Sequence, residues 1–365
     1  MFTIQQEVVF EPLQLMMGVV GRRQSVPILA HILLKAHQGQ LMMVGSDQEL
    51  ELKATLPIGV ESIDGEITLP GRKLFDICRN IAAGAVLEVK SSGHLALVSS
   101  ERFHSQLKGL PADNFPLLET RGADLEIMLP GAEFRRLVSR VEFAMAQQDV
   151  RYFFNGLLLE FAGNKLNAVA TNGQRLARSE MLVDSDNVGH IQAIVPRKAV
   201  AEILKLTRQD TDFRLSVTKE HLKLDSNGVC LTTKLIDAVF PDYQRAIPKN
   251  GDKRLLVNRS ELRDALVRMA IVSNELYKNV RLRLGPGQLQ LSTHNPLREE
   301  AEEELAVVYE GDSLEIGFNV NYLIEILGVM DGEQIEIQLS DPGSAALLRN
   351  PADPTAEYVI SPMVI

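Results

Sequence analysis

The sequence has few of the residues and motifs that usually carry covalent, redox or metal chemistry. It holds two cysteines in 365 residues, Cys78 and Cys230, and they form no Cys-x-x-Cys pair. Its seven histidines are scattered without the spacing of metal ligands. Neither a Gly-x-Gly-x-x-Gly motif nor a phosphate loop ending in Gly-Lys-Ser/Thr occurs. We therefore expect no enzyme activity, no catalytic residue, no metal and no cofactor, and we expect both cysteines to be small buried residues in a reducing compartment.

The sequence also lacks the features that direct a chain to a membrane. Residues 1–7 (MFTIQQE) contain no base, unlike the start of a signal peptide, and no apolar run reaches the roughly 18 residues that span a bilayer. We expect a soluble cytoplasmic protein with no membrane partner. Positive charge is scarce as well, because 38 Lys and Arg stand against 48 Asp and Glu, a net charge of −10. Such an excess disfavours nucleic acid unless the bases gather on one surface.

The chain is longer than the roughly 250–300 residues at which a single core stops growing, and its patterns repeat three times. Apolar residues at spacings of three and four predict helices in which Met16, Val141 and Leu266 are equivalent, since both steps are 125 residues. A strand, a break and a second helix recur around Ile77, Ile203 and Ile326, and a strand with a polar turn recurs at 42–47, 166–172 and 289–295. The motif Phe-Pro recurs at 115 and 240. We predict an α+β protein of three similar domains, 1–124, 125–252 and 253–365, each with two helices packed on antiparallel sheets.

Basic residues recur on the predicted helices, opposite the apolar stripes. A solvated helix face explains any one of these groups, but recurrence at equivalent positions of an acidic chain favours a shared basic surface for phosphates. The expected helix near 320–329 is the exception, because it carries Glu325 and no base. We interpret the acidic run 299–304 as an exposed edge or a charged contact surface and not as a metal site. The bases concerned are Arg22, Arg23, Arg72, Lys73, Arg79, Arg135, Arg136 and Arg140 (the last three on a helix near 132–145), Arg197, Lys198, Lys205, Arg259, Arg263 and Arg268.

Five stretches in this order and spacing closely resemble the bacterial DNA polymerase III beta subunit family, the beta sliding clamps: 148–156 (QDVRYFFNG), 170–177 (ATNGQRLA), 195–198 (VPRK), 239–243 (VFPDY) and 358–363 (YVISPM). The resemblance covers the whole chain. It implies the DNA clamp fold, with three clamp domains forming half of a six-domain ring. The ring would be a head-to-tail homodimer that encircles duplex DNA without sequence preference and acts as a nucleoid-associated processivity factor. A repeat-built interaction scaffold that never meets DNA and an enzyme with a site between domains are the alternatives, and the acidic net charge favours the scaffold.

The resemblance also implies a cleft for short peptides of partner proteins. These partners would be the DNA polymerase III alpha subunit, the clamp loader delta subunit, other clamp-binding polymerases, mismatch repair proteins and ligase. Apolar side chains would accept Leu and Phe anchors while arginines fix polar groups at the rim. The matching cleft positions are Arg151, Phe153, Phe154, Thr171, Gly173, Gln174, Arg175, Leu176, Pro241, Arg245, Ala246, Asn319, Tyr322, Pro362 and Met363. The DNA-facing positions are Arg23, Gln148, Tyr152 and Arg197.

The sequence departs from the family pattern in three places. Gln174 stands where the family often has His, and Ser361 stands where it often has Met. The segment 99–105, which reads as a strand, lacks the usual paired arginines before a phenylalanine. Our hypothesis is that this edge still meets the acidic segment 299–304 of a second chain, with Arg102 facing Glu303.

Overall fold

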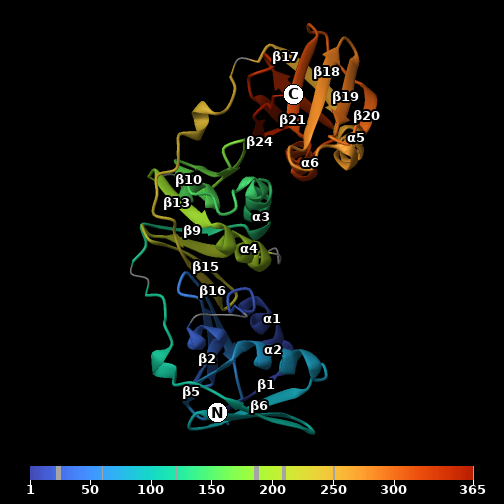
Figure 1. The fold of residues 1–365 in the computed structure, drawn as a ribbon. Coiled ribbons are helices and arrows are strands. Elements are labelled where there is room, and N and C mark those ends of the chain that lie inside the picture. The colour runs from blue at the N-terminus through green and yellow to red at the C-terminus, as the bar shows by residue number, and fades with distance from the viewer. Residues whose placement is uncertain are drawn as a thin grey trace. The chain divides into compact units, whose positions relative to one another are not determined.

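A computed structural model describes residues 1–21, 26–59, 61–119, 122–184, 189–207, 211–249 and 251–364. Within these ranges the chain is six consecutive modules, each with one strand, one helix and then three strands (Figure 1). The first pair of modules comprises β1 (Phe2–Gln5), α1 (Gln6–Met16), β2 (His31–His37), β3 (Gln40–Ser46) and β4 (Leu50–Pro57), then β5 (Gly65–Pro70), α2 (Gly71–Asn80), β6 (Val86–Ser92), β7 (Leu95–Ser100) and β8 (Phe103–Lys108).

The second and third pairs repeat this order. The second comprises β9 (Leu125–Leu129), α3 (Gly131–Ser139), β10 (Gly156–Ala162), β11 (Lys165–Thr171), β12 (Arg175–Leu182), β13 (Ile191–Pro196), α4 (Arg197–Leu206), β14 (Phe213–Val217), β15 (His221–Ser226) and β16 (Val229–Lys234). The third comprises β17 (Lys253–Asn258), α5 (Arg259–Val272), β18 (Asn279–Gly285), β19 (Gln288–His294), β20 (Glu300–Ala306), β21 (Leu314–Asn319), α6 (Val320–Val329), β22 (Gln334–Leu339), β23 (Ala346–Asn350) and β24 (Asp353–Ile360).

All strand pairs between these elements are antiparallel, and the modules of each pair exchange their first strands. β1 joins β6, β7 and β8, whereas β5 joins β2, β3 and β4. Sheets then continue from one pair of modules to the next. β4 pairs with β16, and β12 pairs with β24, so the chain forms two eight-stranded sheets in addition to two four-stranded sheets. The predicted α+β class is therefore confirmed.

The shared sheets explain how the chain divides into compact units. One unit is Met1–Ala132 with Lys198–Leu235, and the other is Glu133–Arg197 with Ile236–Ile365. The middle pair of modules contributes β9 and β14–β16 to the first unit and β10–β13 to the second. The domain boundaries expected from the sequence remain a prediction, and the expected starts at 125 and 253 are the first residues of β9 and β17.

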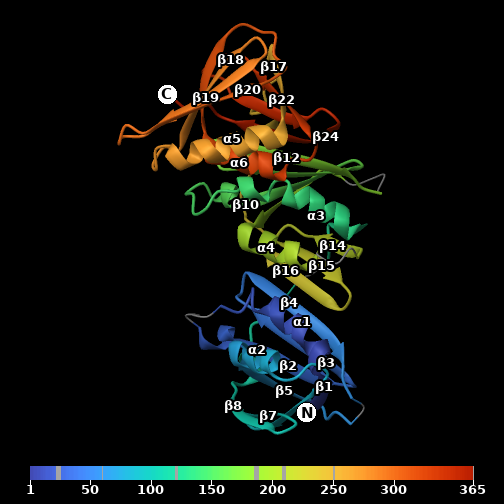
Figure 2. The same ribbon diagram turned by 90° about the vertical axis from the view of Figure 1, so that its right-hand side faces the viewer.

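The helices bury their apolar faces, and two pairs of helices lie together within one unit each. In the first unit α1 and α2 lie side by side, and in the second α5 and α6 do so (Figure 2). Val320, Leu323 and Ile326 of α6 are buried at helical spacing. Asn258 and Asn319 cap α5 and α6, since each side-chain oxygen accepts two backbone N–H groups of the first turn. Among the described residues, no helix is long and apolar enough to cross a membrane.

Three local expectations need correction. The helix expected near 132–145 ends at Ser139, and Arg140 is 5% exposed instead of lying on a solvated face. The segment 99–105 is not one strand, because a turn at Glu101 and Arg102 separates β7 from β8. Cys78 is buried as expected, but Cys230 is only partly buried.

Candidate functional site

The tight turn between β11 and β12 is the structural centre of the predicted cleft. The Asn172 side chain accepts the backbone N–H groups of Gln174 and Arg175, each at 3.0 Å. The Thr171 hydroxyl accepts the N–H of Gly173 at 3.0 Å and donates to the carbonyl of Arg175 at 2.6 Å. Gly173 has φ of +89°, a conformation that favours glycine. These bonds hold the turn in one conformation before any ligand arrives.

An apolar hollow of about 380 Å³ opens on one side of this turn. Its walls are the turn itself, the segment 240–246 and the end of β24. Leu176, Phe240 and Val359 form its apolar base and belong to one buried cluster. The hollow brings together eight of the predicted residues: Phe154, Thr171, Gly173, Gln174, Arg175, Leu176, Pro241 and Ala246.

A second and more polar hollow, of about 630 Å³, opens beside the first. The two share Gly173, Gln174 and Arg175, so the turn is the ridge between them. Arg151 lines the polar hollow, where its side chain makes two hydrogen bonds and its backbone N–H a third to Asp149, and its guanidinium lies 4.5 Å from the ring centre of Phe154. These bonds lower the pKa of Asp149 to about 2, so the pair is charged at neutral pH.

Arg175 is not at the rim, as the sequence suggested, but inside the ridge with only 7% of its surface exposed. Its guanidinium lies between two rings, 4.9 Å from Phe143 and 4.3 Å from Tyr322. It donates to the carbonyl of Phe143 at 2.6 Å and forms an ion pair with Glu325. A buried arginine with these partners is a fixed element of the site and not a mobile rim charge. The predicted Tyr322 packs its ring against Arg175, lines the polar hollow and accepts a hydrogen bond from Asn172 at 3.2 Å.

Five other predicted residues lie around the hollows rather than in their linings. Phe153 packs behind Phe154 with ring centres 4.6 Å apart, and Asn319 caps α6. Arg245 is largely exposed and pairs with Asp242 at 2.9 Å. The chain end lies against β21, since the N–H of Met363 donates to Gly317 at 2.8 Å and Pro362 precedes it.

The sequence interpretation missed several wall residues. Phe240, Tyr243 and Val359 line the apolar hollow, and Phe143 and Glu325 line the polar one. The recurring Phe-Pro motif was the available signal for Phe240. In the sequence Glu325 is an acid on a helix without bases, and no local pattern indicates that it meets Arg175.

The expected DNA-facing residues have different surroundings. Gln148 is exposed, and Tyr152, the first residue of the 3-10 helix Tyr152–Asn155, is 73% exposed. Arg197 is half-buried at the start of α4, donates to the carbonyl of Met145 at 3.0 Å and lines the polar hollow. Arg23 lies outside the described residues, as does Arg22.

Many of the helix bases have acidic partners nearby. Asp76 pairs with both Arg72 and Arg79. Other pairs are Lys198 with Asp47, Lys205 with Glu202, Arg263 with Asp264 and Arg268 with Glu303. Each pair cancels charge locally, so the helices offer phosphates a weaker field than a count of their bases suggests. No group of His, Cys, Asp or Glu among the described residues could hold a metal ion.

Three tandem domains, each with two helices on antiparallel sheets, define the class of DNA clamps. Family models for the N-terminal, central and C-terminal domains of the DNA polymerase III beta subunit match residues 1–119, 128–242 and 244–364. The chain is 44% identical to the beta sliding clamp of Pseudomonas putida over 364 residues and 39% identical to that of Escherichia coli K12 over 363, with 99% of each chain covered in both cases.

Solved structures agree. The DNA polymerase III subunit beta of Pseudomonas aeruginosa matches with a TM-score of 0.98 at 40% identity, with both chains covered completely. The pol III beta of Caulobacter crescentus matches with a TM-score of 0.95 at 33% identity, again over all of both chains. The chain belongs to the DNA polymerase III beta subunit family, the beta sliding clamps, and its function is that of a DNA sliding clamp.

Proposed function

We propose that two copies of this chain close head to tail into a ring around duplex DNA, and that the ring tethers replication and repair proteins without an active site of its own. One observation carries the proposal. We number the modules one to six along the chain, so that each pair holds an odd and an even module. Each internal sheet junction joins the last strand of an odd module to the last strand of the even module in the following pair. These junctions are β4 with β16, of modules one and four, and β12 with β24, of modules three and six. By the same rule β20, the last strand of the fifth module, needs the last strand of an even module in a following pair. β8, the last strand of the second module, needs the last strand of an odd module in a preceding pair. Neither strand has such a partner among the described residues.

The two strands left over are complementary edges. β8 ends the sheet β1-β6-β7-β8, and β20 ends the sheet β20-β19-β18-β21. Unpaired edges expose backbone donors and acceptors that another strand can satisfy. A junction between β20 of one chain and β8 of the next is heterologous, and it closes a ring when the accumulated rotation permits.

The internal repeat also specifies the register of this junction. The pair β3–β4 is equivalent to the pair β19–β20. At the end of the first pair Ser46 faces Glu51, and at the same place in the second His294 faces Glu300, so Leu52 corresponds to Ala301. In the same way β15–β16 is equivalent to β7–β8. Ser226 faces Val229 in the first of these pairs and Ser100 faces Phe103 in the second, so Leu231 corresponds to Ser105. Leu52 faces Leu231 in the first junction. We therefore expect Ala301 to face Ser105 of the partner chain.

This register modifies the expected ion pair between chains. It places Arg102 opposite Glu304, one residue from the Glu303 expected from the sequence. Glu303 already has a partner in its own chain, since Nε of Arg268 donates to it at 2.8 Å. Glu304 is exposed and is the better acceptor for Arg102 of a second chain.

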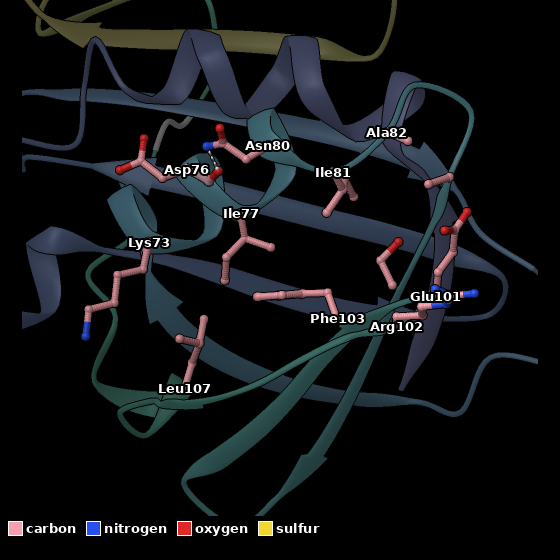
Figure 3. Close-up of a pocket in the computed structure, with 12 residues that line it drawn as sticks. Lys73, Asp76, Ile77, Asn80, Ile81, Ala82, Glu101, Arg102, Phe103 and Leu107 are labelled. Carbon is pink, nitrogen blue, oxygen red and sulfur yellow. Dashed lines mark hydrogen bonds between the residues drawn. The ribbon is translucent and has the colours of Figure 1, made fainter.

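A groove beside β8 supports the same contact. It has a volume of about 670 Å³ and lies between α2 and β8. Figure 3 shows Phe103 pointing into it beneath Ile77 of α2, with Ile81 and Leu107 nearby. An apolar groove next to an open edge fits an apolar side chain beside the partner's β20. Ile271 of α5 is 80% exposed and is the candidate, because α5 packs on β20.

Cysteine cross-linking tests the register. Facing residues of antiparallel strands have Cα atoms close enough for a disulfide. We expect Ser105→Cys combined with Ala301→Cys to give a covalent dimer in mild oxidant, seen on a non-reducing gel. His104→Cys with Ala301→Cys is the matched control, since a shift of one residue turns the thiol to the other face. Equal yields from the two pairs would reject the register.

A charge swap tests the contact independently of the thiols. Arg102→Glu and Glu304→Arg should each weaken the dimer in sedimentation experiments, and the double variant should recover part of the loss. Wild-type behaviour of both single variants would remove this ion pair.

Encirclement explains how an acidic protein can act on DNA. A closed ring is held by its topology, so non-specific contacts to phosphate suffice and permit sliding. Gln148, Tyr152, Arg197 and, outside the described residues, Arg23 remain the proposed contacts. The test is to load the protein onto nicked circular DNA with its loader and then cut the circle. A ring slides off, a direct binder stays, and a scaffold never associates.

The paired hollows are the proposed docking site for short peptides of the polymerase alpha subunit, the clamp loader delta subunit, other polymerases, mismatch repair proteins and ligase. The apolar hollow suits Leu and Phe anchors, and the polar hollow with Arg151 suits the peptide's hydrogen-bonding groups. Arg151→Ala with Met363→Ala should weaken a polymerase tail peptide at least about tenfold and leave the dimer intact. Arg214→Ala with Met128→Ala, exposed residues of the same types on β14 and β9, is the matched control. Unchanged affinity in the first variant would remove the cleft assignment.

A further inference from the structure

The wall of the apolar hollow formed by residues 240–246 lies outside the sheets. It connects β16 to β17 and contains only one short 3-10 turn, Tyr243–Arg245. It nevertheless carries Pro241 and Ala246 of the hollow's lining. A segment without strand pairing needs side-chain anchors to keep one position. Phe240 and Tyr243 are these anchors, since each is 6% exposed and belongs to the cluster beneath the hollow.

The two anchors differ in kind. Phe240 packs by shape alone, whereas the Tyr243 hydroxyl donates a hydrogen bond of 2.6 Å to Oε2 of Glu160. Glu160 lies within β10 and is 8% exposed. Its other oxygen, Oε1, lies 2.8 Å from Nε2 of Gln192 and 3.0 Å from Nε2 of His190. Both carboxylate oxygens are therefore engaged, and only one of their partners belongs to the wall.

The charges make this bond stronger than an ordinary tyrosine contact. Burial would raise the pKa of Glu160, but the hydrogen bonds from Tyr243, Gln192 and His190 outweigh it and lower the pKa. Burial and the bond to Glu160 raise the pKa of Tyr243 to about 12. At neutral pH a neutral hydroxyl thus donates to a charged carboxylate, a combination with a larger net contribution than a neutral pair.

The chain's own first repeat offers a comparison. The position equivalent to Glu160 is Lys35, which pairs with Glu66 at the surface, and the position equivalent to Tyr243 is Leu118. Glu160 and Tyr243 therefore occur together beside the apolar hollow. The equivalent positions of the first repeat, 35 and 118, carry neither a carboxylate nor a tyrosine.

We propose that Glu160 and Tyr243 are positioning residues for partner binding, which hold the 240–246 wall in place so that the apolar hollow exists before a peptide arrives. The inference rests on the cleft proposed above. Glu160 has no place in the lining of either hollow, so it acts through Tyr243. Without their bond the wall would have to be ordered at the moment of binding, and the peptide's affinity would fall accordingly.

The test uses the intact dimer and a fluorescein-labelled peptide copied from the C-terminal tail of a DNA polymerase III alpha subunit. We expect Tyr243→Phe to weaken the peptide's Kd by about fivefold. Glu160→Leu should weaken it by a similar factor, and Glu160→Gln, which keeps an acceptor oxygen, by less. The double variant Tyr243→Phe/Glu160→Leu should bind no more weakly than the worse single variant, because both changes remove the same bond. Amide hydrogen exchange should accelerate at residues 243–246 in step with the loss of affinity.

Tyr309→Phe is the matched control. Tyr309 is 2% exposed and donates a hydrogen bond of 2.5 Å to the carbonyl of Asp312, on a loop that lines neither hollow. It should leave the Kd unchanged. If Tyr243→Phe binds like the wild type while Arg151→Ala with Met363→Ala does not, the positioning role is wrong and the cleft stands. If additive losses appear in the double variant, the two residues act separately and the inference also fails. Absence of peptide binding to the wild-type dimer would instead reject the cleft itself.

Discussion

Arg140 offers the sharpest test of how the second compact unit is held together. Its buried guanidinium hydrogen-bonds Asp331 at 2.5 Å, Asp353 at 2.6 Å and Thr355 at 3.0 Å. Removing one partner of a buried ion pair costs about 3–5 kcal/mol when the remaining charge has no other partner. Here Asp353 retains Thr355 and Arg136, and Asp331 is half-exposed, so we expect Arg140→Ala to lower the free energy of unfolding by about 2 kcal/mol.

The pH dependence gives this prediction a signature. Burial would raise the pKa of Asp353, but hydrogen bonds from Thr355 and Arg140 outweigh it and lower the pKa to about 2. A carboxyl group with a lowered folded-state pKa stabilises the fold above its unfolded value of about 4 and loses that contribution as the pH falls toward 2. The difference between Arg140→Ala and the wild type should therefore shrink from pH 7 to pH 3.

Urea unfolding followed by circular dichroism at pH 7, 5 and 3 measures this difference. Arg263→Ala is the control, because its surface pair with Asp264 at 3.8 Å contributes less than about 0.5 kcal/mol. A loss for Arg140→Ala that stays constant with pH, or that is no larger than the control's, would refute the assignment.

Three further predictions concern single side chains. Burial raises the pKa of Cys78 to about 11, so at pH 8 Ellman's reagent should leave Cys78 unreacted until the protein is unfolded. Burial also raises the pKa of Cys230. Gly173→Ala should lower the free energy of unfolding by about 1–2 kcal/mol, because Gly173 has φ of +89°. It should also weaken binding of the peptide, because the added Cβ meets the Arg151 guanidinium at 3.2 Å. Gly39→Ala, at φ of +75° with open space around it, should lower the stability alone. Burial raises the pKa of Glu51, so its charged form opposes folding increasingly as the pH rises. Glu51→Gln should therefore be more stable than the wild type at pH 7, by about 0.5–1 kcal/mol in urea unfolding. This gain should be lost near pH 4, where the carboxyl group of the wild type is protonated.

The sequence predicted elements best where the signal is local. The helix expected near 320–329 runs over Val320–Val329, because its apolar spacing and its Asn319 cap coincide. α3 ends early because Arg140 turns toward Asp331 and Asp353, residues about 200 positions away that no local pattern could indicate. The junctions of β4 with β16 and of β12 with β24 were beyond reach for the same reason.

The candidate site shows the same division. The family stretches identified the turn at 171–176 and the Pro241 wall. They did not indicate that Arg175 lies inside the ridge, because its partners Phe143, Tyr322 and Glu325 come from three separate elements. Nor did they indicate that most helix bases have acids beside them, since a helical pattern places a side chain on a face without naming its neighbours.

The turn at 171–176 has an almost identical twin in the first repeat. Asp47 accepts the N–H groups of Glu49 and Leu50 as Asn172 accepts those of Gln174 and Arg175, and Gln48 has φ of +75° where Gly173 has +89°. At the next position the twin carries Glu51, buried and bonded to the N–H of Leu118, where the turn at 171–176 carries Leu176. One backbone shape thus recurs with and without the side chains of the proposed docking site. On such a triplicated chain the number of sites of this kind is consequently set by a few side chains, which substitutions can change without altering the frame.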